Sequence, residues 1–263
     1  MIILLHSSKT MSISPHGNVQ LRQPQLLEKS LNLDTYLKTL SEAQLGKIMK
    51  LSSALAKKTH ALIASWTAEP KSQSLALDSF IGDIYSGLRA PSFSAADRDY
   101  ADETLRILSG LYGIIRPYDG ICAYRLEMGY KFPDPKFTNL YEFWGKSIAE
   151  CLPKQGPVIN LASDEFADVV TPFIDKSRII APKFLTVSPK TGEPAFVVIH
   201  AKIARGAFAH WLITSRTKDA ADLNQFHELG YRYDQKLSTS NIPVFVCKNF
   251  GGKGLSMKTR KSF

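Results

Sequence analysis

Cysteine is scarce in this 263-residue chain, and the few cysteines present exclude two kinds of site. Cys122, Cys151 and Cys247 are far apart and odd in number. Their spacing fits neither a disulfide framework nor a cysteine-based metal site. Reduced thiols of this kind are typical of the cytoplasm, where we expect the protein to act.

Long hydrophobic runs are also missing from the sequence. No apolar run approaches the roughly 20 residues that a membrane-spanning helix needs. The apolar stretch Met1–Leu5 is too short for the core of a signal peptide and lacks a cationic start. We therefore expect no membrane partner.

The sequence lacks the familiar signatures of catalysis and cofactor binding. No nucleophile elbow, Rossmann glycine motif or kinase signature occurs. No two histidines form a close pair of the kind that binds zinc. The histidines are His6, His16, His60, His200, His210 and His227. We expect no metal site and no cofactor, while an iron site built from scattered histidines and glutamates stays open as an alternative.

Acidic residues are outnumbered, with 24 Asp and Glu against 33 Lys and Arg, which gives a formal charge of +9 and a pI near 9.4. Excess positive charge favours polyanionic partners, although it also simply keeps a protein in solution. We predict one domain over residues 1–250 and a basic, disordered tail over residues 251–263. Four cations of the tail account for part of the charge, and without them the total is +5. They are Lys253, Lys258, Arg260 and Lys261.

Apolar periodicity alternates between strand-like and helix-like segments along the chain. Strands are expected at residues 1–6, 158–162, 178–187, 195–200, 229–235 and 242–248. Helices are expected at residues 24–39, 41–49, 52–66, 95–108, 139–152, 164–170 and 201–215. Neither a repeat nor a Pro- or Ser-rich linker divides the chain. This pattern predicts a single mixed α/β (α+β) domain, in which helices flank a mixed sheet.

One segment, residues 105–129, combines a packed apolar run with charged residues. Arg125 and Glu127 are two positions apart, so on an extended chain their side chains share a face. A buried guanidinium and a buried carboxylate are costly unless they are paired. We therefore expect this segment to deliver Arg116, Arg125 and Glu127 to one place.

Residues 41–66 predict a helical hairpin with its turn at residues 50–52. In a helix-hairpin-helix, backbone N–H groups at the start of the second helix receive a DNA phosphate. The usual turn is glycine, apolar, glycine, and both glycines are missing here. An ordinary hairpin with solvated lysines is the alternative interpretation. The candidate phosphate contacts are Lys50, Ser52, Lys57 and Lys58.

Further candidate residues lie at strand ends and on one helix. Lys9 and Thr10 follow the first strand, in a turn that resembles a phosphate-binding loop without its glycines. Glu165 follows a later strand, and ligands of open α/β sheets sit at such strand ends. Lys202 and Arg205 are neighbours on one helix. Solvated residues are the alternative interpretation at each of these positions.

Several longer motifs stand in a characteristic order along most of the chain. They are Gly-Asp-Ile-Tyr-Ser-Gly-Leu at residues 82–88, Leu-Ser-Gly-Leu-Tyr-Gly-Ile-Ile-Arg-Pro at 108–117, Tyr-Arg-Leu-Glu-Met-Gly at 124–129, Leu-Tyr-Glu-Phe-Trp-Gly at 140–145, Val-Ile-Asn-Leu-Ala-Ser-Asp-Glu at 158–165 and Ala-Lys-Ile-Ala-Arg-Gly at 201–206. Together they resemble the YaaA family of bacterial peroxide-stress proteins. The family's Ser-Pro-Ala-Lys-Thr turn is partly replaced here by His6-Ser7-Ser8, while Lys9 and Thr10 remain.

The resemblance implies a single-domain mixed α/β fold, DNA binding through a helical hairpin, a basic cleft and a role in limiting oxidative damage by free iron. It also favours functional roles for the candidate cations. The first functional hypothesis is therefore a DNA-binding protein of the peroxide stress response. Its cations would neutralise phosphates of double-stranded DNA, largely without reading the sequence.

The alternative hypothesis is an enzyme that acts on a nucleotide or a nucleic-acid base. Glu127 or Glu165 would serve as acid or base, and arginines would hold the phosphate of a small anionic ligand. A pocket of mixed acids and bases favours this hypothesis, whereas a shallow, wholly basic groove favours DNA binding. Direct iron sequestration is a third hypothesis, with the weakest support in the residues.

Overall fold

The chain folds into short strands and helices, which the computed structural model describes over residues 1–13, 19–134 and 136–256. The strands are β1 (Ile2–His6), β2 (Thr10–Met11), β3 (Ser74–Leu75), β4 (Phe80–Ile81), β5 (Leu105–Ser109), β6 (Gly113–Ile115), β7 (Gly120–Ile121), β8 (Val158–Asn160), β9 (Ile179–Ile180), β10 (Lys183–Val187), β11 (Pro194–Ala195), β12 (Tyr231–Tyr233) and β13 (Val244–Cys247). The α-helices are α1 (Leu27–Leu37), α2 (Glu42–Met49), α3 (Ser53–Ser65), α4 (Ala76–Ser79), α5 (Asp83–Leu88), α6 (Ala95–Thr104), α7 (Leu140–Trp144), α8 (Ser147–Glu150), α9 (Asp164–Ala167) and α10 (Val198–Ser215). Short 3₁₀ helices are η1 (Pro70–Ser72), η2 (Ala90–Ser92), η3 (Thr171–Phe173), η4 (Lys176–Arg178), η5 (Ala220–Gln225), η6 (Glu228–Gly230) and η7 (Lys253–Leu255).

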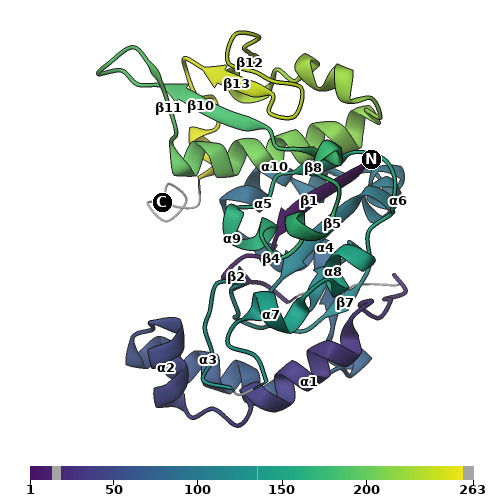
Figure 1. The fold of residues 1–263 in the computed structure, drawn as a ribbon, viewed down its shortest axis with the longest axis vertical. Helices are drawn as coiled ribbons and strands as arrows, with labels where there is room; N and C mark the ends of the chain where they lie inside the picture. Colours follow the sequence, from purple (N-terminus) through teal and green to yellow (C-terminus); the bar gives the residue numbers. More distant parts are fainter. Residues whose placement is uncertain (14–18, 135, 257–263) are drawn as a thin grey trace.

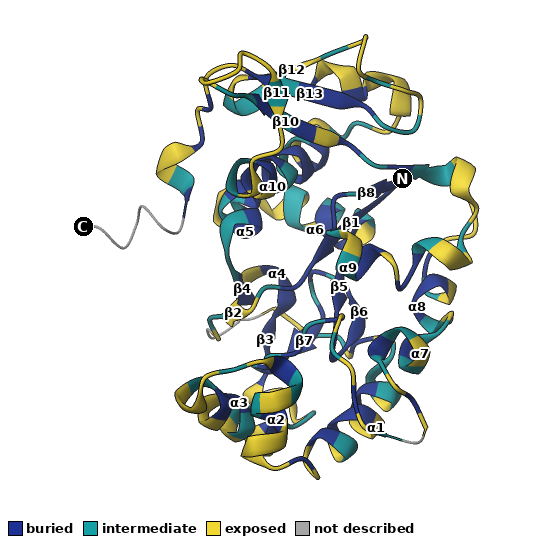
Figure 2. Cartoon of the chain, turned by 60° about the vertical axis from the view of Figure 1, so that its left-hand side comes forward, coloured by how far each residue is buried: buried dark blue, intermediate teal, exposed yellow. Residues whose placement is uncertain are grey.

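The centre of the molecule is a five-stranded sheet in the order β6-β5-β1-β8-β9. β1 runs parallel to β5 and β8, β8 runs parallel to β9, and β6 returns antiparallel to β5. Every residue of β1 is buried, because an apolar strand in the middle of a parallel sheet is covered on both faces (Figure 2). This sheet and the helices around it confirm the predicted mixed α/β fold and the single domain.

A second, four-stranded sheet has the order β11-β10-β13-β12. Helix α10 packs against it and lies between the two sheets (Figure 1). Aromatic rings fill this interface. The ring centroid of Phe184 on β10 lies 5.6 Å from that of Phe208 on α10 and 5.5 Å from that of Phe245 on β13. Helix α10 therefore shares one hydrophobic core with both sheets.

Helices α5 and α10 cross at two glycines that allow their backbones to touch. A Cβ atom at Gly206 would lie 1.8 Å from the carbonyl oxygen of Ile84, and one at Gly87 would lie 2.0 Å from that of Ile203. Only glycine, which has no side chain, permits so close an approach. The crossing fixes the position of α10 relative to the end of β4 and the start of α5.

The helix that begins after Ser94 is shorter than predicted. It ends at Thr104, and Leu105 opens β5, which pairs with β1. Leu105, Ile107 and Leu108 are fully buried. An apolar run that is buried on all sides has no clear period, so its local pattern does not distinguish a helix from a strand. Residues 105–109 form a strand because they pair with β1, which is distant in the sequence.

Three other predicted elements differ from the structure. The strand expected at residues 178–187 is divided between β9 in the central sheet and β10 in the second sheet. The helix expected at residues 139–152 is split into α7 and α8 at Gly145, whose φ of +50° is a left-handed conformation that favours glycine. The strand expected at residues 195–200 is reduced to β11, since residues 198–200 form the first turn of α10. β10 and β11 pair antiparallel, as predicted.

The helices expected at residues 24–39, 41–49 and 52–66 are confirmed as α1, α2 and α3, with shorter ends. Within the described ranges, no helix is both long and apolar enough to cross a membrane. Of the predicted tail, residues 251–256 are described and include η7, while residues 257–263 lie outside the described residues.

Replacing Gly206 by alanine should destabilise the fold. The added methyl group overlaps the backbone of α5, and overpacking of this kind costs roughly 3 kcal/mol. Chemical denaturation measures the loss in the free energy of unfolding. Gly254→Ala is the control, because a Cβ atom there meets nothing within 4 Å. Equal stability of the two variants would contradict the close helix crossing.

Candidate functional site

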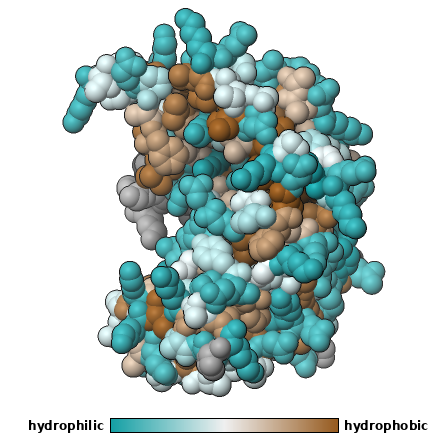
Figure 3. All heavy atoms as spheres, viewed as in Figure 1, coloured by the Kyte–Doolittle hydropathy of each residue, from teal (hydrophilic) through white to brown (hydrophobic). Residues whose placement is uncertain are grey.

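A pocket of about 500 Å³ opens at the carboxyl end of β1. Strand β8 is parallel to β1 and ends at the same edge, where ligands of open α/β sheets bind. On the face shown in Figure 3 the outline of the molecule is hollowed at mid-height, between the second sheet and helices α2 and α3. The pocket is lined by His6, Ser7, Ser8, Lys9, Thr10, Ile81, Gly82, Asp83, Ile84, Tyr85, Glu127, Ser163, Glu165, Phe166 and Lys202.

Lys9 and Glu127 form an ion pair at one wall of the pocket. Nζ of Lys9 lies 2.9 Å from Oε1 of Glu127, and the hydroxyl of Tyr130 donates to Oε2 at 2.8 Å. Burial and this carboxylate raise the pKa of Tyr130, which therefore stays a protonated donor. Nη1 of Arg125 donates to the backbone carbonyl of Lys9 at 3.2 Å. The fold thus brings Arg125 and Glu127 together beside Lys9.

Glu165 comes from the first turn of α9 and is oriented by a glycine. Its Oε1 accepts a hydrogen bond from the backbone N–H of Gly129 at 2.9 Å. A Cβ atom at residue 129 would lie 3.1 Å from this oxygen, so the absence of a side chain makes room for the carboxylate. Among the described residues Oε2 has no hydrogen-bond partner, which leaves an acceptor for a ligand.

His6 is the last residue of β1, and its imidazole is held neutral. The backbone N–H of Ser163 donates to Nδ1 at 3.2 Å, and the ring stacks on Phe166 with centroids 4.8 Å apart. Burial, followed by the positive charges of Arg205 and Lys202, lowers the pKa of His6 to about 3. Because Nδ1 accepts a hydrogen bond, the proton of the neutral ring lies on Nε2.

Lys202 and Arg205 are one turn apart on α10. Lys202 is exposed and lines the pocket, whereas Arg205 is partly buried. Burial lowers the pKa of Arg205, and the charge of Asp164 opposes this effect. Neither cation forms a salt bridge within the part of the chain that the structure describes. The two leave positive charge without a bound counterpart beside His6, which suits an anionic ligand.

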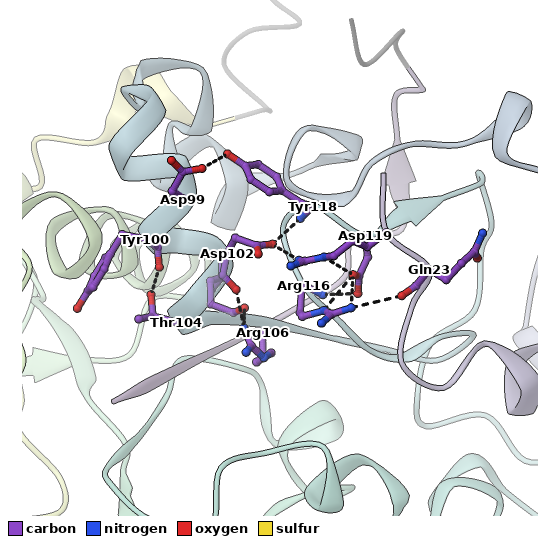
Figure 4. A network of polar contacts seen from close by, with 11 residues as sticks. Gln23, Asp99, Tyr100, Asp102, Thr104, Arg106, Arg116, Tyr118 and Asp119 are labelled. Atoms are coloured by element: carbon purple, nitrogen blue, oxygen red, sulfur yellow. Dashed lines mark hydrogen bonds and ion pairs between the residues drawn. The ribbon is translucent and has the colours of Figure 1, made fainter. Parts of the chain in front are cut away.

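Arg116 does not join this pocket, which corrects the expectation that it meets Arg125 and Glu127. Because β6 runs antiparallel to β5, the chain has returned to the opposite end of the sheet when it reaches Arg116. There Nε of Arg116 donates to Oδ1 of Asp119 at 3.0 Å (Figure 4). Asp119 is fully buried, and burial raises its pKa to about 6 although Arg116 acts to lower it. Arg116 therefore neutralises a buried carboxylate.

The α2–α3 hairpin carries a second group of predicted cations, at the end of the molecule away from the second sheet (Figures 1 and 2). Lys50 ends α2 with a φ of +53°, the left-handed conformation that glycine usually adopts there. The side chain of Ser52, the N-cap of α3, makes no capping hydrogen bond. Lys57 and Lys58 are exposed on α3.

The predicted residues thus fall into three places. Lys9, Thr10, Glu127, Glu165 and Lys202 line the pocket, with Arg125 and Arg205 beside it. Lys50, Ser52, Lys57 and Lys58 lie on the hairpin, and Arg116 lies at the opposite edge of the central sheet.

Sequence reasoning did not select His6 or Ser163 as site residues. The signal that identifies them is position, since each follows an apolar strand and parallel strands end at one edge. Within residues 1–13, 19–134 and 136–256, no group of three or more His, Cys, Asp or Glu side chains is arranged to hold a metal ion.

The neutral state of His6 should make the stability of the protein fall at acid pH. Its pKa is about 3 in the folded protein and about 6.5 in an unfolded chain, so the unfolded state takes up the proton first. This contribution to the free energy of unfolding is complete above pH 6.5 and is lost as the pH falls toward 3, by about 1.4 kcal/mol per pH unit.

Urea unfolding of the wild type and of His6→Asn at pH 7 and pH 5 measures this contribution. Asparagine keeps an acceptor for the N–H of Ser163 and does not titrate, so its stability should fall by about 2 kcal/mol less than that of the wild type. Parallel losses in the two proteins would show that His6 is not held neutral by the fold.

Comparisons with known proteins identify the family of this chain. A family profile described as peroxide stress protein YaaA matches residues 1–237. A UPF0246 protein of Salinispora tropica is 56% identical to this chain over 258 residues, which are 98% of either sequence. A match of this length covers the pocket, the hairpin and both sheets. The chain therefore belongs to the family of the peroxide stress protein YaaA.

Proposed function

We propose that this protein binds double-stranded DNA, largely without reading its sequence, and so protects it against iron-driven oxidative damage during peroxide stress. Membership of the YaaA family supports the role in peroxide stress. The proposal of DNA binding rests on the α2–α3 hairpin. No side chain caps the start of α3, and exposed lysines lie near it.

The hairpin offers two kinds of contact to a phosphate. The first-turn N–H groups of α3 lie at the positive end of the helix dipole, where a phosphate is stabilised. Lys57 and Lys58 follow one turn later, and Lys50 stands at the preceding corner. Contacts of this kind position a duplex and supply affinity, but they carry no sequence information.

The affinity for a duplex of mixed sequence should fall steeply with salt, because neutralised phosphates release bound counterions. The logarithm of the association constant falls by about 0.9 per phosphate for each log unit of salt. Replacing both Lys57 and Lys58 by glutamine should weaken binding and reduce this slope by roughly 2. Fluorescence anisotropy with a labelled duplex measures both quantities.

The control for this experiment is Lys154→Gln, in the exposed connection before β8. This lysine lies at the amino end of the central sheet, away from the hairpin, so its loss should leave the slope unchanged. A flat salt response of the wild type, or equal slopes of the double variant and the control, would remove the hairpin from the DNA-binding surface.

An enzyme that acts on a nucleotide or a nucleic-acid base is a second candidate function. The observation that favours it is the mixed lining of the pocket, to which Glu127, Glu165, Lys9 and Lys202 all contribute. A wholly basic groove would bind a polyanion, whereas paired acids and bases suit proton transfer to and from a bound molecule. Glu127, held by Lys9 and Tyr130, is the better oriented of the two carboxylates.

Replacing Glu127 by glutamine separates the two candidate functions. The variant should bind duplex DNA like the wild type, because the carboxylate lies in the pocket and not on the hairpin. The rate at which nucleotides or oligonucleotides are converted should fall by about 100-fold or more. Mass spectrometry of the products measures this rate. Glu193→Gln, on the exposed turn between β10 and β11, is the matched control. Conversion that persists in Glu127→Gln would rule out this carboxylate as the acid or base.

A further inference from the structure

We propose that the pocket at the end of β1 holds one nucleoside monophosphate unit, whose phosphate lies between Lys202, Arg205 and the Nε2–H of His6. The second candidate function underlies this assignment, which names the class of ligand and adds His6 as a binding residue. Three kinds of group support it: two cations, of which Lys202 lines the pocket and Arg205 lies beside it, one neutral donor and one open carboxylate.

The cations supply the charge for a phosphate. Lys9 is also in the pocket, but its charge is already balanced by Glu127 at 2.9 Å. Neither Lys202 nor Arg205 forms a salt bridge among the described residues, although the charge of Asp164 acts on Arg205. Both cations act on His6 electrostatically. Because Arg205 is partly buried, an anion beside it is shielded from water, and the attraction is stronger than on the surface. The geometry therefore places the anionic end of a ligand on the α10 side.

His6 supplies a donor that carries no charge. The ring is 9% exposed and still lines the pocket. Its Nδ1 is occupied by the N–H of Ser163, and stacking on Phe166 fixes its plane. The Nε2–H has no acceptor within the described ranges, so it is free to donate to a ligand in the pocket. A phosphate oxygen in the pocket satisfies this donor.

The carboxylates of the lining select what is attached to the phosphate. Oε2 of Glu165 is an open acceptor, and Glu127 adds a second carboxylate. The charge of Glu165 disfavours a ligand that is anionic throughout, and both carboxylates can accept hydrogen bonds from hydroxyl or N–H groups. A ribose and a base carry such donors. The volume of about 500 Å³ fits one small molecule and is too small for a duplex.

The same chemical unit has two sources. One is a free nucleoside monophosphate, and the other is a single nucleotide turned out of a DNA strand into the pocket. A duplex held at the α2–α3 hairpin would supply the nucleotide that turns out of DNA. The two sources are distinguished by which ligand changes the signals of His6.

The test uses the full-length protein labelled with ¹⁵N in its histidine rings. Thymidine monophosphate, thymidine, inorganic phosphate, and a duplex with one unpaired nucleotide are titrated in turn. The monophosphate should shift the His6 ring nitrogens and bind at least about tenfold more tightly than thymidine or phosphate alone, because each lacks one half of the contacts. A response to the unpaired duplex identifies a nucleotide within DNA as the source, and a response to the monophosphate alone identifies the free nucleotide.

Matched variants assign the contacts. Lys202→Gln and Arg205→Gln should each weaken monophosphate binding by about tenfold or more, while Lys154→Gln should not. His6→Phe keeps the stacked ring and loses the donor, so binding should weaken, whereas His6→Asn keeps an N–H donor and should bind more tightly than His6→Phe. Lys202 is exposed, so its variant tests the site even if the His6 variants fail to fold.

Absence of any response of His6 to all four probes would overturn the assignment, as would wild-type affinity of Lys202→Gln. Binding is measured here without turnover. A monophosphate that binds but is not converted upholds the site while removing the enzymatic function, so the two failures are distinguishable.

Discussion

The contact between α5 and α10 is the constraint on which the candidate site depends. The two backbones touch at Gly87 and Gly206, where no side chain fits between them. Helix α10 is held against the second sheet by aromatic packing on its other side. With both sides fixed, the turn that carries Lys202 and Arg205 has one position, beside the end of β1. The charge of the pocket is therefore set by helix packing and not by the local sequence.

The fold explains why this protein combines two surfaces of different chemistry. The hairpin is exposed, rich in lysine and begins α3 with open N–H groups, so it suits a large polyanion. The pocket is small, and its two glutamates are partly buried and individually oriented. A polyanion needs no such orientation, whereas a small ligand does. The two surfaces are compatible, because one can hold a strand while the other receives a single unit of it.

Much of the fold can be predicted from local sequence patterns, whereas only part of the candidate site can. The apolar run of β1, the hairpin at residues 41–66 and the helix that carries Lys202 and Arg205 are visible in the sequence. The strand β5 is not, because a fully buried apolar run looks alike as helix or strand. Lys9 and Glu165 could be selected because residues that follow apolar strands gather at one sheet edge.

Arg116, which was predicted in the pocket, shows which information a local sequence pattern does not contain. Arg116 and Arg125 are nine positions apart, yet the antiparallel return of β6 sends the first to the opposite end of the sheet. Likewise, the hydrogen bond from Gly129 to Glu165 joins residues that are 36 positions apart. Such pairings depend on strand order, which one sequence does not reveal. The same holds for His6, whose lowered pKa arises from burial and then from the charges of Arg205 and Lys202, which lie far away in the sequence on α10.

The position of β1 has a consequence for how the chain reaches its native state. Ile3 pairs with Leu105, and Ile2 pairs with Val158, so the middle strand of the central sheet is made long before either neighbour. During synthesis its apolar residues have no partner strand until Leu105 has emerged, and the second neighbour follows only at Val158. Contacts of such high sequence separation slow folding and expose aggregation-prone surface. The sheet that organises the pocket can therefore be completed only after β9, at residues 179–180, has left the ribosome.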